Sequence, residues 1–443
     1  MADTSLARAA LELNPWLTAP DRFSDFVTQR HLPTTGFRTR TVRLPLDTER
    51  ATLVIGPRQA GKSSLVWRHL ADLGPAVLYL TGEEPLVREL AQSPALFRSA
   101  LRELLPAPSA ILIDEAQHLP DAGLLIKALV DSRPGCPVVV TGSSSFHLLA
   151  RTRESLAGRA HYVRLLPFSF EELRPVGALG PALAQVLDEQ TYARQVLYGG
   201  YPRVALAPSE AEAEAELHRL VRAVVLRDAS DMHRVRNGPA FRRLLELAAQ
   251  QVGNPVNLSE WSALLEVQRA TVADWLALLE DMHVLHTCPV YAGGKRAELT
   301  SSRKVFFVDC GLRNALVDSF ADLRLRADRG ALTEQWVFTE LHKVPAFEDR
   351  IHYWRTKAGA EVDFVIDLPA GLVGLEVKAG PAHPPRLSKS ALSFVQAYRP
   401  TALFIVHDGP ENTATVEGVP VRWVPLVGFS ERVQAVVGAG RVV

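Results

Sequence analysis

The sequence predicts a multidomain α/β protein whose first large domain is a doubly wound parallel sheet. Between residues 51 and 166, short apolar runs, largely β-branched, alternate with helical segments, as buried parallel strands and their crossover helices do. The runs are residues 52–55, 76–80, 110–114, 138–141 and 162–166. A glycine-rich turn joins the first run to the helix that follows it. The chain has 443 residues, the length of about three domains.

The composition of the chain argues against a membrane protein, a secreted protein and a strongly basic nucleic-acid-binding protein. Lys plus Arg number 49 and Asp plus Glu number 49, so no overall basic excess indicates nucleic-acid binding, although a local basic patch is compatible with this balance. No apolar run has the length of a membrane span, and the N-terminus lacks the apolar core of a secretory signal. Cys136, Cys288 and Cys310 share no metal-binding spacing and are expected to be reduced thiols. We therefore expect a cytoplasmic protein without a membrane partner.

A phosphate-binding loop is predicted between the first strand and the next helix. Residues 56–63 fit the pattern G-x-x-x-x-G-K-S. A glycine-rich turn of this kind points backbone N–H groups into one concavity, and the helix N-terminus adds the positive end of its dipole. Lys62 is expected to reach the β- and γ-phosphates of ATP, and the Ser63 hydroxyl to ligate Mg²⁺. The predicted ATP-binding residues are Gly56, Pro57, Arg58, Gln59, Ala60, Gly61, Lys62, Ser63 and Ser64.

Two acids at the end of the third run predict hydrolysis of ATP. Asp114 and Glu115 lie at the C-terminal end of a strand, which is where open α/β sheets bind ligands. Asp114 is expected to hold the Mg²⁺ shell, mostly through water, and Glu115 to polarise the attacking water as a general base. A water-activating base favours an ATPase over a nucleotide kinase. Thr141 and Ser143, after the next run, are candidates to sense the γ-phosphate, but a simple turn would also use such residues.

An arginine offered to the nucleotide of a neighbouring subunit would stabilise charge in the transition state. Arg159 is the first candidate for this role and Arg151 the second, and each is equally compatible with an ordinary surface position. The sequence does not show which subunit an arginine faces.

These motifs together resemble a known family. GPRQAGKSS, ILIDEAQ, VVVTGSSS and LAGR, in this order, are similar to the motifs of a bacterial and archaeal family of AAA-type ATPases, P-loop proteins of the ASCE type. Residues 198–203, Tyr-Gly-Gly-Tyr-Pro-Arg, resemble the GG-aromatic-Pro signature that follows the ATPase core in that family. The resemblance covers most of the chain. It implies an ATP-driven oligomeric machine or switch, without implying one substrate. We expect ATP to bind between the subunits of a homo-oligomer, such as a hexameric ring.

The patterns divide the chain into five regions. They are an N-terminal extension (1–45), the ATPase core (46–166), a helical lid or linker (167–235), a winged helix (236–310) and a last domain (311–443). Residues 30–43 are rich in Arg and Thr. They are expected to be a solvated lead-in to the first strand, with an arm that touches DNA as the alternative.

The winged helix is predicted from three helical segments followed by a Gly-rich hairpin. The helices are residues 241–251, 258–267 and 269–282, and the strands are residues 284–291 and 304–308. On DNA, the third helix would enter a groove and the hairpin would meet phosphates. The residues expected to make these contacts are Gln268, Arg269, Thr271, Lys295, Arg296, Arg303 and Lys304. Asp274, Glu280 and Asp281 would repel phosphate, so a winged helix used only for packing is an equal alternative.

A hairpin in the last domain predicts a second charged site. Residues 361–367 and 374–378 largely alternate polar with apolar side chains, and residues 368–371 between them read as a tight turn. If the turn is centred between residues 369 and 370, Asp363 lies across from Glu376, with their Cβ atoms about 5 Å apart. A divalent cation would relieve the repulsion between these carboxylates, with Lys378 beside it. A register slip of one residue would undo the alignment.

The D…ExK pattern resembles that of the PD-(D/E)XK nuclease superfamily, a restriction-endonuclease-like α/β fold. Glu334, on a predicted helix at 332–341, matches the additional helical acid of that superfamily. The resemblance implies that Glu334, Asp363 and Glu376 bind Mg²⁺ or Mn²⁺ and that Lys378 steadies the charge of the reaction. A fold retained for binding or assembly, without cleavage, is the alternative.

These observations together predict a cytoplasmic ATPase that forms a homo-oligomer and moves on or remodels DNA. Two other functions stay open. The first is an ATP-dependent regulatory switch that binds a protein partner, and the second is an ATP-dependent DNA nuclease that needs a metal. ATP and Mg²⁺ are the expected cofactors, with a second divalent cation in the last domain for the nuclease.

Overall fold

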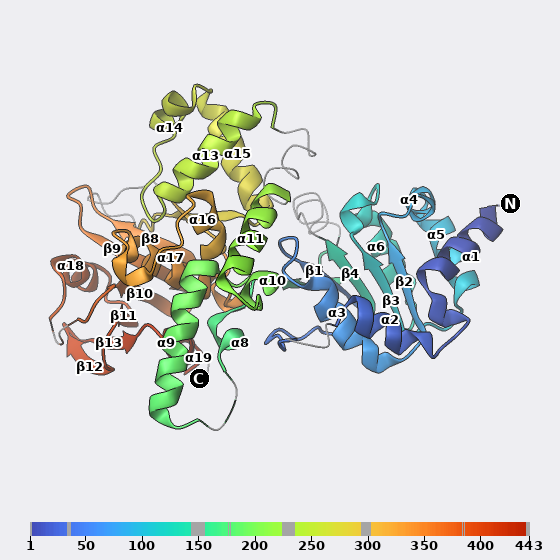
Figure 1. The fold of residues 1–443 in the computed structure, drawn as a ribbon, viewed down its shortest axis with the longest axis horizontal. Helices are drawn as coiled ribbons and strands as arrows, with labels where there is room; N and C mark the ends of the chain where they lie inside the picture. Colours follow the sequence, from blue (N-terminus) through green and yellow to red (C-terminus); the bar gives the residue numbers. More distant parts are fainter. Residues whose placement is uncertain are drawn as a thin grey trace. The chain divides into compact units, whose positions relative to one another are not determined.

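The computed structural model describes residues 2–32, 37–142, 156–175, 177, 179–223, 235–293, 303–382, 384 and 386–439. The chain forms two compact units (Figure 1). The first unit contains Met1–Leu166 and Asp281–His283, and the second contains Pro167–Glu280 and Val284–Val443. No helix in the described ranges combines the length and the apolar character that crossing a membrane requires.

The first unit is built on a parallel sheet of five strands. The strands are β1 (Ala51–Ile55), β2 (Val77–Thr81), β3 (Ala110–Asp114), β4 (Val138–Gly142) and β5 (Ala160–Arg164), in the spatial order β2-β3-β4-β1-β5. Each predicted apolar run forms one of them, although β5 begins and ends two residues before the predicted run. Because β4 lies between β1 and β3, the strand before the phosphate loop and the strand that carries Asp114 are not neighbours.

Helices cover both faces of this sheet, so the predicted doubly wound arrangement is confirmed (Figure 1). On one face, α4 (Pro85–Ala91), α5 (Pro94–Leu104) and α6 (Ala122–Asp131) pack on alternate strand residues such as Leu53 and Ile113. On the other, α3 (Lys62–Leu70) and the N-terminal helices pack on the residues in between, such as Val54 and Leu112. The alternation arises because successive side chains of a strand point to opposite faces of the sheet. Short 3₁₀ turns, η2 (Ala71–Leu73) and η3 (Ala116–His118), follow α3 and β3.

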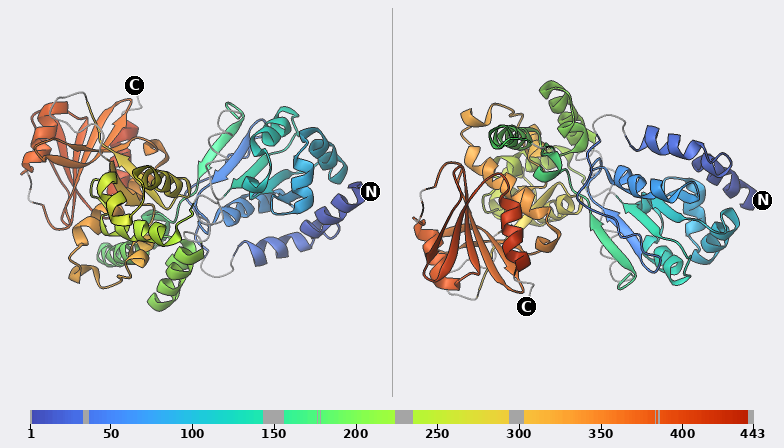
Figure 2. Two further views of the ribbon diagram at one scale, coloured as in Figure 1. Left: turned by 90° about the horizontal axis from the view of Figure 1, so that it is seen from above. Right: turned by 90° about the horizontal axis from the view of Figure 1, so that it is seen from below.

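The predicted N-terminal extension packs on this sheet as part of the first unit (Figure 2). It forms α1 (Ala2–Leu13), η1 (Pro15–Leu17) and α2 (Arg22–Arg30). Asn14 uses its side-chain amide to accept from the Tyr79 N–H (2.7 Å) and donate to the Tyr79 carbonyl (2.8 Å). The Trp16 indole donates to the Val77 carbonyl (2.9 Å). These two side chains therefore occupy the edge of β2, which has no strand partner on that side.

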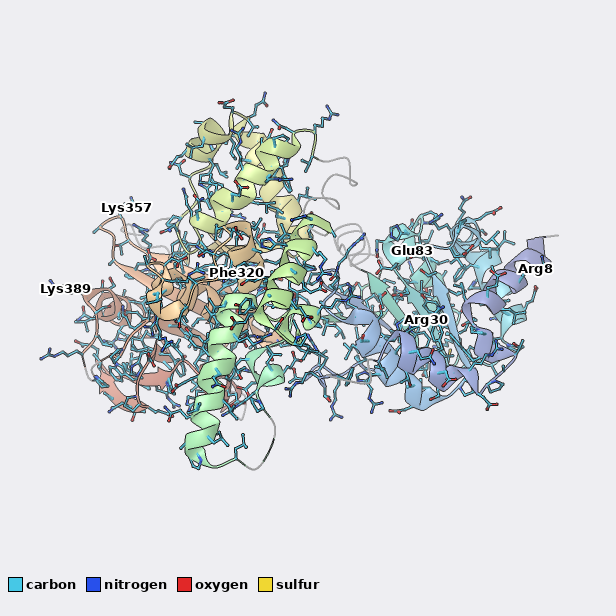
Figure 3. The ribbon with its side chains drawn as sticks, in the orientation of Figure 1. Arg8, Arg30, Glu83, Phe320, Lys357 and Lys389 are labelled. Carbon is cyan, nitrogen blue, oxygen red and sulfur yellow. The ribbon has the colours of Figure 1, made fainter. Side chains whose placement is uncertain are left out.

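Aromatic side chains bind the N-terminal helices to α3. Trp16 lies edge-on to Trp67 of α3, with ring centroids 5.7 Å apart, and His31 stacks on Trp67 at 5.2 Å. The guanidinium of Arg30, which is labelled in Figure 3, lies 5.1 Å from the centre of the Phe26 ring. Burial is the main reason that the pKa of His31 falls to about 4, and the charge of Arg30 adds to it. His31, in the stretch predicted as a lead-in or a DNA-touching arm, thus packs against α3, whereas Arg30 is exposed.

The second unit begins with the predicted helical linker. Its helices are α8 (Phe170–Leu173), α9 (Pro181–Tyr198), α10 (Pro202–Ala205) and α11 (Glu210–Leu220). Gly199 ends α9 with φ 79°, and a Cβ there would collide with the Asp309 carboxylate, which accepts from the Gly200 N–H at 2.7 Å. The two glycines of the GG-aromatic-Pro signature therefore let a buried carboxylate cap a tight turn.

The region predicted as a winged helix contains three helices and an antiparallel pair of strands. They are α13 (Gly238–Gln250), α14 (Leu258–Leu265), α15 (Arg269–Asp281), β6 (Leu285–Pro289) and β7 (Arg303–Phe307). Pro255, between α13 and α14, forms an isolated antiparallel bridge with Lys304 of β7. Element order is thus as predicted, whereas the tip of the hairpin, residues 294–302, lies outside the described residues.

The last region contains a mixed sheet of six strands in the order β12-β13-β11-β10-β9-β8. The strands are β8 (Ile351–Arg355), β9 (Glu361–Leu368), β10 (Gly371–Val377), β11 (Ala402–His407), β12 (Asn412–Val416) and β13 (Val419–Pro425). The helices are α16 (Cys310–Leu316), α17 (Arg329–His342), α18 (Lys389–Tyr398) and α19 (Phe429–Ala439), with 3₁₀ turns η5 (Leu323–Leu325) and η6 (Pro345–Phe347). Cys136, Cys288 and Cys310 are free and buried, in agreement with the expectation of reduced thiols.

Candidate ATP site and the charged cluster of the second unit

The phosphate loop has the backbone that its glycines predict. Gly56 has φ 150° and Gly61 has φ 94°, in the region that favours glycine, and α3 begins directly after Gly61. A Cβ at position 56 would collide with the Leu165 carbonyl oxygen, so the loop packs closely on the chain that follows β5. Gln59 also has a positive φ of 62°, which is uncommon for a residue with a side chain and marks a conformation imposed by its surroundings.

Lys62 lies inside the loop and is only 5% exposed. Its ammonium donates to the carbonyls of Gly56 (3.0 Å) and Pro57 (2.9 Å). Burial lowers the pKa of Lys62 to about 8, although the carboxylates of Glu115 and Asp114 oppose the shift. The ammonium thus lies at the loop with neutral carbonyl partners, whereas a charged phosphate would be a stronger partner.

Asp114 is held by two hydroxyl groups at the C-terminal edge of the sheet. Thr141, at the end of β4, donates to Asp114 Oδ1, and the Tyr79 hydroxyl lies 3.4 Å from Oδ2 as a donor. The same Thr141 oxygen accepts from the Glu115 N–H at 3.1 Å. Burial raises the pKa of Asp114, and the hydrogen bond from Thr141 opposes that rise. Thr141, predicted as a sensor, thus fixes both acids in this structure.

The backbone of Glu115 has a strained conformation. Its φ of 50° is in the left-handed region, where a residue with a side chain is held only by its surroundings. The Gln117 amide donates to Glu115 Oε2 and so orients the carboxylate. A carboxylate fixed next to Asp114 at the sheet edge is suited to take a proton from water.

The arrangement fits ATP with Mg²⁺. The fit depends on a buried lysine, a helix N-terminus behind a glycine-rich loop, and oxygen ligands from Ser63 and Asp114. Within the described ranges, no group of three or more His, Cys, Asp or Glu side chains forms a metal cage. Mg²⁺ bound with ATP needs no such cage, because it binds through few protein oxygens plus phosphates and water.

Of the remaining predicted residues of this site, Arg159 is described. It lies just before β5, where its carbonyl accepts from the Ala51 N–H (2.9 Å), and its side chain pairs with Asp131 (2.6 Å). That is the edge of the sheet opposite to the phosphate loop, so Arg159 does not serve the nucleotide of its own chain. Ser143 and Arg151 lie outside the described residues.

The predicted DNA-contact residues differ in their exposure to solvent. Arg269 is exposed at the first residue of α15, and Lys295 and Arg296 lie outside the described residues. Lys304 does not face solvent, which corrects the expectation that it contacts phosphate. It is 1% exposed and forms ion pairs with Glu334 (2.9 Å) and Glu361 (2.6 Å).

The predicted hairpin register is confirmed. Gly371 pairs with Leu368 and Leu375 with Phe364, so Glu376 follows in line with Asp363. Glu334 is on α17, as predicted. Lys378 pairs with Glu376 at 2.5 Å. The expected second cation is not supported, because the described residues contain no metal-type cluster and a buried lysine lies among the acids.

Comparison with known proteins agrees with this site. Residues 48–174 match the family described as AAA domain. Residues 189–325 and 329–426 match two families described as domains of unknown function, DUF8612 and DUF4143. Residues 48–174 are therefore an AAA-type domain, which supports binding of ATP by this part of the chain.

Two curated relatives are uncharacterized proteins of Mycobacterium bovis and Mycobacterium tuberculosis. Each is 29% identical over 409 residues, which cover 90% of this chain and 86% of the relative. Among solved structures, the Aeropyrum pernix Orc1 protein in complex with DNA is 16% identical with a TM-score of 0.30, and Pyrobaculum aerophilum Cdc6p is 14% identical with a TM-score of 0.25. Both alignments cover 62% of this chain and 88% of the other. Scores this low do not extend the assignment beyond the AAA domain.

Proposed function

We propose that this protein hydrolyses ATP in its AAA domain and, as a homo-oligomer, uses the energy to move on or remodel DNA. The observation that carries hydrolysis is the Thr141 bridge, which fixes Asp114 and Glu115 together at the edge of the sheet that bears the phosphate loop. A loop that only stored nucleotide would not need a base fixed in this way.

In the proposed reaction, the loop N–H groups and Lys62 bind the phosphates. Asp114 and Ser63 would hold Mg²⁺, which would supply positive charge to neutralise the phosphates. Glu115 accepts a proton from the attacking water. The water oxygen bonds to the γ-phosphorus as the bond to the β–γ bridging oxygen breaks, which leaves ADP and phosphate. Gln117 keeps the Glu115 carboxylate in position.

Two variants and a control test hydrolysis. Lys62→Ala is expected to abolish nucleotide binding, and Glu115→Gln to retain ATP binding while turnover is lost. Glu83→Gln is the matched control, because Glu83 is an exposed acid that follows β2 at the same edge of the sheet (Figure 3). ATP turnover at the wild-type rate by the Lys62 variant would show that the site is assigned wrongly.

The chain between the two units supports a coupling role. Leu165 donates to the Ile55 carbonyl (2.7 Å) at the start of the phosphate loop. Three residues later, Phe168 donates to the Gly200 carbonyl (2.7 Å) and accepts from Lys343 (2.9 Å). A shift of the loop on nucleotide binding would thus act on a short segment whose far end is bound to the second unit.

The proposal for DNA depends on the predicted winged helix, in which Arg269 begins the exposed end of α15. We would measure ATP turnover alone and with single-stranded, duplex and branched DNA. We expect one of these DNA forms to stimulate ATP turnover. Arg269→Ala should weaken this stimulation, whereas the control Arg242→Ala on α13 should not. Turnover indifferent to every DNA would favour the alternative, a switch that binds a protein partner.

The homo-oligomer is proposed because Arg159 lies far from the phosphate loop of its own chain, so an arginine at this position would reach only the nucleotide of another subunit. Sedimentation of Glu115→Gln with and without ATP tests this. A species larger than a monomer that requires ATP is expected, and a monomer under both conditions would contradict the proposal.

A further inference from the structure

One acid of the predicted nuclease-like site, Glu334, pairs with a buried lysine that also pairs with the neighbouring acid Glu361. Lys304 belongs to β7, and its ammonium pairs with Glu334 of α17 (2.9 Å) and Glu361 of β9 (2.6 Å). It also lies 5.2 Å from the centre of the Tyr353 ring on β8. One cation therefore bridges two carboxylates from a helix and a strand, the kind of position in which a metal-dependent nuclease would hold a divalent ion.

The other two acids of the motif have partners of their own. Asp363 Oδ2 accepts from the Val377 N–H at 2.7 Å. Glu376 pairs with Lys378 at 2.5 Å through one oxygen and accepts from the Ser388 hydroxyl at 2.9 Å through the other. Ser388 in turn caps α18. Both oxygens of Glu376 and one oxygen of Asp363 thus have partners within the protein.

Lys304 brings a positive charge to this setting. Its ammonium forms ion pairs with Glu334 and Glu361. A second cation held by these carboxylates would meet repulsion from the ammonium at short range.

We propose that Lys304 serves as a permanent internal cation of this acidic cluster, so that the last domain binds no catalytic metal and does not cleave DNA. Metal-ligand carboxylates have to offer free oxygen lone pairs to the ion. Here the Lys304 ammonium pairs with Glu334 and Glu361. Both oxygens of Glu376 and one oxygen of Asp363 already accept from groups of the protein. The inference goes beyond the proposed ATPase and holds whether or not ATP is hydrolysed.

Manganese binding tests the inference directly. The full chain without nucleotide is titrated with Mn²⁺, and free Mn²⁺ is followed by its paramagnetic resonance signal. Wild type and Asp363→Asn are expected to bind the same amount. Lys304→Met, which removes the ammonium and keeps an apolar stem, is expected to gain one Mn²⁺ per chain, and Lys304→Met with Asp363→Asn to lose it again. Lys357→Met, at an exposed lysine of the same domain, is the control and should bind as wild type does.

Two results of the Mn²⁺ titration would overturn the inference. Mn²⁺ bound by wild type and lost in Asp363→Asn would show that the cluster holds metal beside Lys304, and a folded Lys304→Met that gains none would show that the lysine does not occupy a cation position. If Lys304→Met does not fold, the comparison of wild type with Asp363→Asn decides. The inference would also be refuted if the protein cleaved DNA in the presence of Mn²⁺ and Glu376→Gln abolished the cleavage. ATP turnover is measured in a separate assay, so a failure of the proposed ATPase function would not change the outcome of the Mn²⁺ titration.

Discussion

Thr141→Val tests whether the bridge between the two acids supports catalysis. Valine has nearly the shape of threonine, so the change removes a hydroxyl and little volume. Asp114 loses a donor to its carboxylate, and a hydrogen bond to a charged group contributes about 1.5–3 kcal/mol. The Glu115 N–H loses its acceptor, which costs about 1 kcal/mol more.

The loss should appear in turnover more than in ATP binding. If about 1.4–2.8 kcal/mol of the loss falls on the transition state, kcat decreases by about 10- to 100-fold. The KM for ATP should change less, because the loop backbone and Lys62 still bind the phosphates. Asp114 would also titrate at a higher pH than in wild type, since burial already raises its pKa and the hydrogen bond that opposes the rise is gone.

Thr52→Val is the matched control. Thr52 is also buried in the sheet, and its hydroxyl donates to the Pro45 carbonyl, near the start of β1 and away from the phosphate loop. It should lose stability, measured by urea denaturation, and keep its kcat. The reasoning would be refuted if Thr141→Val turned over ATP at the wild-type rate, or if Thr52→Val lost as much kcat.

Three further predictions concern the first unit. Because the pKa of Lys62 is about 8, ATP affinity measured by calorimetry should fall by about tenfold per pH unit above pH 8, and Lys62→Arg, which stays charged, should flatten this dependence. Trp16→Ala should lower the free energy of unfolding by about 3–5 kcal/mol, because Trp16 is 0% exposed, while Leu11→Ala, 44% exposed, should change it little in the same urea titration. Since His31 is neutral in the fold, with a pKa of about 4 against 6.5 unfolded, wild type should lose stability as the pH falls from 6.5 towards 4, and His31→Phe should lose less over that window when melting is followed. An equal loss in both chains would contradict the burial of His31.

Features that depend on local patterns could be predicted from the sequence. The phosphate loop needs only a strand, a glycine-rich turn and a helix in succession, and the hairpin register follows from the length of one turn. Asp114 and Glu115 were placed correctly at the strand end for the same reason. Their chemical roles stay predictions.

Features that depend on long-range packing were missed. Tyr79 reaches Asp114 because β2 and β3 pair in parallel with Thr81 opposite Asp114, and nothing in residues 77–81 alone indicates that register. For Lys304, a signal was present. In a strand it shares a face with Phe306, two residues later, and both are buried. The positive charge was interpreted as exposed because its partners, Glu334 and Glu361, come much later in the chain.

The edge of β2 has a consequence for how copies of the chain can meet. An uncovered edge strand is a template on which another chain adds a strand, and this is a common route to aggregation. Here Asn14 and Trp16 satisfy the outward groups of Tyr79 and Val77 as a neighbouring backbone would. The side chains of a short turn thus block strand addition on this side. A chain lacking its first helices would expose this edge of β2 to strand addition.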